Sequence, residues 1–122
     1  MRNYGGLDGI AEAKTLFADV LGVDSTEIFI GGNSSLSLMH YTLWFATHLG
    51  LHSESTAWNK QTDTIKVLCP CPGYDRHFSL CDELGLEMIP VPLTGEGPDM
   101  DVVEQWIRTD RDIKAMWCVP RF

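Results

Sequence analysis

The sequence predicts a three-layer α/β/α fold with a mainly parallel sheet. Short apolar runs typical of buried strands alternate along the chain with segments of helical periodicity. Strand–helix alternation of this kind forms right-handed βαβ units, which place helices on both faces of a parallel sheet. The expected strands are residues 27–30, 66–70, 86–91 and 113–119.

Length and composition set limits on the class of protein. The 122 residues are enough for one hydrophobic core, so residues 1–122 are interpreted as a single domain. A net charge of −8 argues against a nucleic acid or an anionic membrane as the main partner. No apolar run is long enough to cross a bilayer, and the first residues have no signal-peptide core, which makes the cytoplasm the expected location.

The first half of the chain predicts two helices and a polar loop. Asp8 is placed to cap the first helix, and Gly22 to end it. The second helix runs over residues 35–49 and carries apolar residues on more than one face, which indicates burial. Residues 51–64 are polar and are interpreted as a surface loop or insertion with one apolar anchor, Trp58.

The second half predicts further helices, over residues 75–84 and after a turn at residues 94–98, where Asp101 and Glu104 have capping-box-like spacing. All four cysteines lie in or beside apolar segments, which favours reduced and mostly buried thiols. A metal or redox protein built on these cysteines is the least supported alternative, because Cys-x-Cys is not the spacing of a zinc knuckle. The cysteines are Cys69, Cys71, Cys81 and Cys118.

A glycine pair follows the first apolar run and precedes the second helix. Gly31 and Gly32 would let the main chain approach a ligand, and the amides at the start of the next helix would face an anion. Asn33, Ser34 and Ser35 add side-chain donors. The simpler alternative is that Asn33 or Ser34 caps an ordinary helix.

An aromatic residue, Tyr74, follows the strand at residues 66–70. Ligands of such sheets bind outside the carboxyl ends of the strands, where the glycine pair is also expected. A phosphate cradle together with an aromatic ring suggests a flat, phosphorylated cofactor. Alternatively, Tyr74 is a loop aromatic that covers the following helix.

Several motifs occur in the order of one enzyme family. Residues 3–10 (Asn-Tyr-Gly-Gly-Leu-Asp-Gly-Ile), 31–36 (Gly-Gly-Asn-Ser-Ser-Leu), 71–74 (Cys-Pro-Gly-Tyr) and 97–101 (Gly-Pro-Asp-Met-Asp) resemble the first part of a pyridoxal-phosphate-dependent aminotransferase of fold type I. The resemblance is to the class I, aspartate-aminotransferase-like branch. It implies transfer of an amino group between an amino acid and a 2-oxo acid, with pyridoxal 5'-phosphate as cofactor.

The resemblance also implies roles for particular residues. Gly32, Asn33 and Ser34 match the loop that binds the cofactor phosphate, and Tyr74 matches the aromatic residue that stacks on the pyridine ring. Tyr4 matches the tyrosine that reaches the cofactor of a neighbouring subunit, so a homodimer is implied. Relatives often have Thr or Lys where this chain has Asn33, which changes a side-chain contact and spares the backbone contact.

The resemblance predicts that the catalytic groups lie outside these 122 residues. The family's Schiff-base lysine, the acid that pairs with the pyridinium nitrogen and the arginine for the substrate carboxylate come later in its sequences, and none of Lys14, Lys60, Lys66 and Lys114 matches the lysine. The chain is therefore interpreted as the N-terminal part of a large domain. Whether this chain alone is an enzyme stays open, with a non-catalytic phosphate-binding, pyridoxal-phosphate-binding or dimerisation module as the alternative.

The family's seven-stranded sheet has the order 3-2-4-5-6-7-1, and this chain would supply strands 1 to 4. In that order, strand 1 (residues 27–30) is separated from strands 2 to 4 by three further strands, which this chain does not contain. We expect this segment either to stay detached or to pair with the open edge of residues 113–119.

Overall fold

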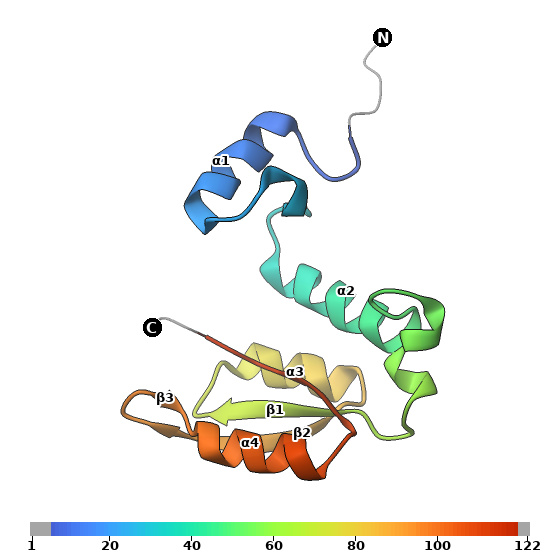
Figure 1. Cartoon of the computed structure of the whole chain (residues 1–122), viewed down its shortest axis with the longest axis vertical. Coiled ribbons are helices and arrows are strands. Elements are labelled where there is room, and N and C mark those ends of the chain that lie inside the picture. The colour runs from blue at the N-terminus through green and yellow to red at the C-terminus, as the bar shows by residue number, and fades with distance from the viewer. Residues whose placement is uncertain (1–5, 120–122) are drawn as a thin grey trace. The chain divides into compact units, whose positions relative to one another are not determined.

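The computed structural model describes residues 6–119. The chain divides into two compact units, Met1–Leu38 and Met39–Phe122, and each is described by itself (Figure 1). The expectation of a single domain over residues 1–122 stays a prediction. Among the described residues, no helix has the length and apolar character that a membrane crossing needs.

The first unit holds the helix α1 (Ala11–Leu21) and the short 3-10 helix η1 (Ser25–Glu27). Gly22 ends α1 as predicted, in the left-handed conformation with φ 71°. The N-cap of α1 is Ile10, and Asp8 does not cap the helix. Instead, the Asp8 carboxylate pairs with Lys14, and its carbonyl accepts the Ile30 N–H at 2.9 Å.

The strand expected at residues 27–30 does not form. Glu27 ends η1, and the residues that follow it belong to no strand. An apolar run becomes a strand only when another strand satisfies its backbone groups, and here the Ile30 amide is satisfied by Asp8. Among the described residues, this segment forms no strand pairing with β4.

The second unit contains a four-stranded mixed sheet of order β3-β2-β1-β4. The central strand β1 (Lys66–Cys71) pairs in parallel with β2 (Glu87–Thr94) and with β4 (Ile113–Met116). The order β2-β1-β4 is the one that the family resemblance implies for the family's strands 3, 2 and 4. The two-residue strand β3 (Gly97–Pro98) adds an antiparallel edge, which the sequence did not predict.

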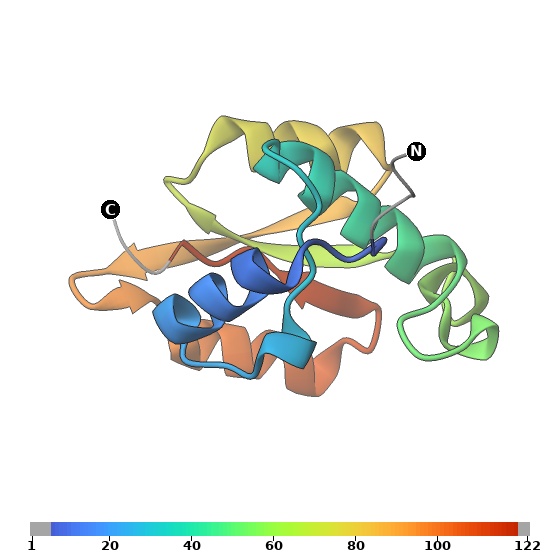
Figure 2. The ribbon, with the colours of Figure 1, turned by 90° about the horizontal axis from the view of Figure 1, so that it is seen from above.

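Helices cover both faces of this sheet, as predicted (Figure 2). Alternate residues of β1 point to opposite faces, so Val67 and Cys69 pack with Cys81 of α3 (Asp75–Glu83), whereas Leu68 packs with Val103 of α4 (Met100–Thr109). The N-cap of α4 is Asp99, not Asp101: its carboxylate accepts the amides of Asp101 and Val102. The α2 helix (Ser35–His48) contributes Leu43 to the α3 side.

The polar segment after α2 is folded rather than extended. Gly50 follows the helix with φ 78°, and residues 51–64 contain two 3-10 helices, η2 (Glu54–Thr56) and η3 (Trp58–Lys60). Between them Ala57 is fully buried, and the Trp58 side chain packs against the α3-side core as its predicted anchor role requires.

Candidate functional site

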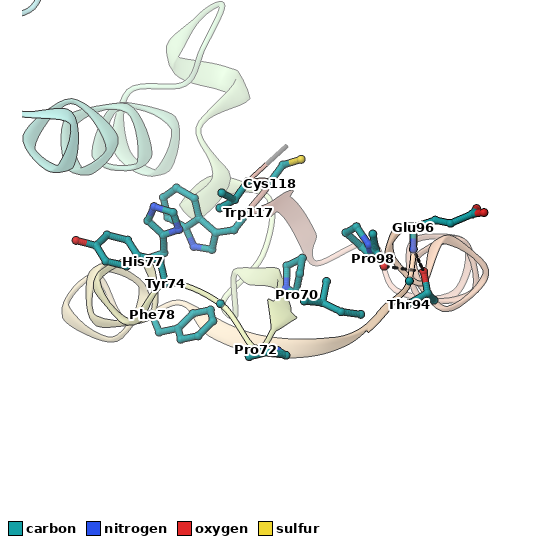
Figure 3. A pocket seen from close by; sticks show the side chains of 15 residues that line it. Pro70, Pro72, Tyr74, His77, Phe78, Thr94, Glu96, Pro98, Trp117 and Cys118 are labelled. Carbon is teal, nitrogen blue, oxygen red and sulfur yellow. Dashed lines mark hydrogen bonds between the residues drawn. The ribbon is translucent and has the colours of Figure 1, made fainter. Parts of the chain in front are cut away.

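A pocket of about 410 Å³ opens in the second unit where β1, β2 and β4 end (Figure 3). Its position agrees with the rule that ligands bind at the carboxyl ends of parallel strands. Three segments form its walls: the loop after β1 with the start of α3, the β2–β3 hairpin, and the residues after β4. The lining residues are Pro70, Pro72, Gly73, Tyr74, His77, Phe78, Leu93, Thr94, Gly95, Glu96, Gly97, Pro98, Trp117, Cys118 and Val119.

Tyr74 lies at the N-terminus of α3 and lines this pocket. It is the N-cap residue of the helix, and its side chain is half-exposed. Its ring meets the His77 imidazole edge-on, with the ring centroids 5.2 Å apart and the planes at 88°. Sequence reasoning therefore placed Tyr74 correctly at the strand ends, and its role toward a ligand stays a prediction.

His77 and Trp117 form a second aromatic contact that sequence reasoning missed. The two rings stack at 4.4 Å with an interplanar angle of 13°. His77 is 7% exposed, and the Trp117 indole Nε1 donates a hydrogen bond to Cys81 Sγ at 3.1 Å. The spacing of Tyr74, His77 and Cys81 along α3 was the available signal, because residues three and four apart share a helix face.

The buried thiols of Cys69 and Cys81 form a coupled pair behind this wall. The Cys69 thiol donates to the Val67 carbonyl at 3.6 Å. The interaction with the Cys69 side chain, together with the Trp117 N–H, lowers the pKa of Cys81 to about 7, against the burial of the site. The interaction with Cys81 and burial raise the pKa of Cys69. All four cysteines are free, but Cys71 and Cys118 are exposed, so the expectation of mostly buried thiols holds for only half of them.

The expected phosphate-binding residues lie in the first unit. Gly32 has φ 104°, a conformation that side-chain-bearing residues rarely adopt. Ser34 precedes α2, and its Oγ accepts the Ser37 amide at 3.3 Å and the Ser37 hydroxyl at 2.9 Å. Ser34 thus caps the helix, as the simpler alternative stated, and Asn33 beside it is exposed. The fifth expected site residue, Tyr4, lies outside the described residues.

None of the four lysines lines the pocket. Lys66 and Lys114 lie at the beginnings of β1 and β4, at the opposite end of the sheet from the pocket. Lys66 pairs with Asp110 at 2.8 Å, and Lys114 donates to the Gln61 side chain at 3.0 Å. Lys14 and Lys60 pair with carboxylates close to them in the sequence. Within residues 6–119, the pocket has no amine for covalent chemistry.

Comparison with known proteins identifies the family. The family model described as aspartate amino-transferase matches residues 1–122. The chain belongs to this aspartate aminotransferase family. It is 43% identical over 122 residues to the aspartate aminotransferase of Corynebacterium glutamicum, and spans 28% of that relative's length. The chain therefore corresponds to part of an aminotransferase.

Solved structures of the family agree with this assignment. A crystal structure of an aspartate transaminase from Corynebacterium glutamicum matches 96% of this chain with a TM-score of 0.85 and 43% identity, over 27% of its own length. The fold also matches LysN, an α-aminoadipate aminotransferase from Thermus thermophilus, over 89% of this chain and 24% of LysN, with a TM-score of 0.66 and 21% identity.

Proposed function

We propose that this chain provides part of the pyridoxal 5'-phosphate site of an aminotransferase, which transfers an amino group between an amino acid and a 2-oxo acid. The observation that carries the proposal is the Tyr74-lined pocket at the carboxyl ends of the parallel strands, in a chain of this family. The Thermus relative was solved with N-(5'-phosphopyridoxyl)-L-leucine, a covalent adduct of this cofactor.

The pocket residues fit the ring of the cofactor. About 410 Å³ is within the range of small-molecule sites, and the walls are mostly apolar and aromatic. The half-exposed ring of Tyr74 provides a flat face on which a heteroaromatic ring would stack. Gly73 lets the chain pass close to Pro70 and Phe78, because a Cβ there would lie 2.6 Å from the Pro70 carbonyl oxygen and 2.7 Å from Phe78 Cζ.

The glycine turn in the first unit fits the phosphate. Among the described residues, no atom beyond its chain neighbours lies within 4 Å of the position that a Cβ of Gly32 would take, so the backbone there is open to a ligand. The Ser37 amide is taken by Ser34, whereas the amides of Ser35 and Leu36 have no partner within the helix, and the positive end of the helix dipole favours an anion. Asn33 and Ser34 would add side-chain donors to the same phosphate.

Membership of the aminotransferase family supports a division of roles. A bound pyridoxal phosphate supplies the electron sink that stabilises negative charge on the substrate carbon. The residues of this chain would hold the phosphate and orient the ring, while the proton-transferring lysine, the acid at the ring nitrogen and the carboxylate-binding arginine would lie in other parts of the protein. Tyr4 would reach the cofactor of a second subunit, so the proposed assembly is a homodimer. We also propose that the protein is of fold type I and is located in the cytoplasm.

Titration with pyridoxal 5'-phosphate and, separately, with inorganic phosphate tests the proposal. Ser34→Ala should weaken both ligands, whereas Tyr74→Ala should weaken only pyridoxal phosphate, several-fold for an aromatic contact of about 1 kcal/mol. Tyr41→Ala is the matched control, because Tyr41 is also half-exposed but does not line the pocket. Failure of the unmodified chain to bind pyridoxal phosphate saturably would refute the proposal. An absorbance band that survives dialysis would mean that one of the four lysines reacts.

A further inference from the structure

We infer that Trp117 is a positioning residue, which sets the orientation of the Tyr74 ring through His77. The inference rests on the proposed function, because the orientation of Tyr74 matters only if a ring stacks on it. Figure 3 shows the three side chains side by side along one wall of the pocket. Their contacts form a single series from the start of α3 to the end of β4.

Tyr74 cannot fix its own ring. Tyr74 is the N-cap residue of α3, but its side chain makes no capping hydrogen bond and is 50% exposed. Among the described residues, His77 provides its one ring contact. The angle of the Tyr74 ring therefore depends on where the imidazole lies.

The imidazole in turn depends on Trp117. His77 is buried, and its imidazole forms no side-chain hydrogen bond with any of residues 6–119, so its ring contacts with Tyr74 and Trp117 determine its angle. Of the two, the parallel stack on the indole is the closer contact, with 4.4 Å between the ring centroids. A flat pair of this kind restricts the rotation of the smaller ring because it leaves little room on the stacked face.

Trp117 is held at two points. Its backbone N–H donates to the Leu68 carbonyl at 3.0 Å, which joins the segment after β4 to the central strand. Its indole Nε1 donates to the fully buried Cys81 Sγ at 3.1 Å. The sheet and α3 thus fix the indole, the indole fixes His77, and His77 fixes the ring at the pocket.

Two measurements test this order of dependence. In the ligand-free chain, nuclear Overhauser contacts should join the ring protons of Tyr74 to those of His77, and those of His77 to the Trp117 indole. Trp117→Leu should abolish the Tyr74–His77 contact, and Trp117→Phe, which keeps a flat ring, should restore it. Trp106→Leu is the control, because Trp106 is the same residue type but lies on α4, is 39% exposed and does not line the pocket.

Binding provides the second readout. Trp117→Leu should weaken pyridoxal 5'-phosphate about three- to tenfold and leave inorganic phosphate unchanged, whereas Trp117→Phe should stay within about twofold of the unmodified chain. Equal pyridoxal phosphate affinity in Trp117→Leu, or a Tyr74–His77 contact that persists in it, would overturn the inference. If Trp117→Leu does not fold, absence of either ring contact in the unmodified chain refutes it. If the unmodified chain binds no pyridoxal phosphate, the proposed function fails, while the ring contacts still decide the role of Trp117.

Discussion

The indole of Trp117 donates its N–H to the sulfur of Cys81 at 3.1 Å, and so connects the end of β4 to the buried face of α3. The buried Cys69 side chain interacts with the same sulfur, while its own thiol donates to the Val67 carbonyl at 3.6 Å. The indole N–H favours the ionised form of the Cys81 sulfur, because a thiolate accepts hydrogen bonds more strongly than a thiol. This arrangement makes the core next to the pocket sensitive to pH.

The first prediction concerns the ionisation of Cys81. Its pKa is lowered from the ordinary 9.0 to about 7, mainly by the interaction with the Cys69 side chain and further by the hydrogen bond from Trp117. Thiolate absorbance should therefore show one group that titrates near pH 7. In Cys69→Ala this pKa should rise, because the main interaction that lowers it is lost. A titration that Cys69→Ala leaves unchanged would contradict the assignment.

The same pair predicts how stability depends on pH. The lowered pKa of Cys81 adds stability that is fully present above about pH 9 and is lost as the pH falls through about 7. The raised pKa of Cys69 acts in the opposite direction, since above pH 9 only the unfolded chain would ionise that thiol. The free energy of unfolding should thus rise from pH 7 to 9 and fall beyond it. Urea unfolding at a series of pH values checks this, and Cys81→Ala should remove the rise.

The ion pair of Lys66 with Asp110 gives a second pH dependence. The hydrogen bond from Lys66, followed by the Asp112 amide, holds the pKa of Asp110 below its ordinary 3.8. A lowered carboxyl pKa stabilises the fold at neutral pH, and this contribution is lost as the pH falls from about 4 through the lowered value. Asp110→Asn should lower the unfolding temperature at pH 7 and flatten its acid dependence. Asp63→Asn should change neither, because Asp63 is exposed and makes no ion pair among the described residues.

The close turn after α2 predicts that two glycine substitutions differ in their cost in unfolding free energy. Gly50 and Gly85 both have positive φ, 78° and 67°, so alanine is strained at either position. A Cβ on Gly50 would also lie 2.0 Å from the Ser53 carbonyl oxygen, whereas a Cβ on Gly85 would have no atom of the described residues within 4 Å apart from its chain neighbours. Gly85→Ala should cost about 1–2 kcal/mol of unfolding free energy and Gly50→Ala about 2–5 kcal/mol. Equal costs in urea unfolding would contradict this.

How much the sequence predicted differs between these features. The three parallel strands and their order were predictable, because the buried run Val67–Cys69 has a local signature and family resemblance supplied the neighbours. The prediction of a strand at residues 27–30 was wrong, because an apolar run does not show whether a partner strand is present. The place of Tyr74 followed from strand–loop–helix order. Its contacts did not, because Trp117 is distant in the sequence and only packing brings it to His77.

The last prediction tests whether the sheet is the core of the second unit. Leu68, on the central strand, is 2% exposed and packs with Ile89, Val91 and Val103 between the sheet and α4. Leu68→Ala should lower the unfolding free energy by about 2–5 kcal/mol, because both the buried surface and the contacts around the cavity are lost. Leu51→Ala is the control, since Leu51 is 61% exposed and its loss should change stability by no more than about 0.5 kcal/mol. If the two variants unfold at the same urea concentration, the α4 face of β1 is not the packed core described here.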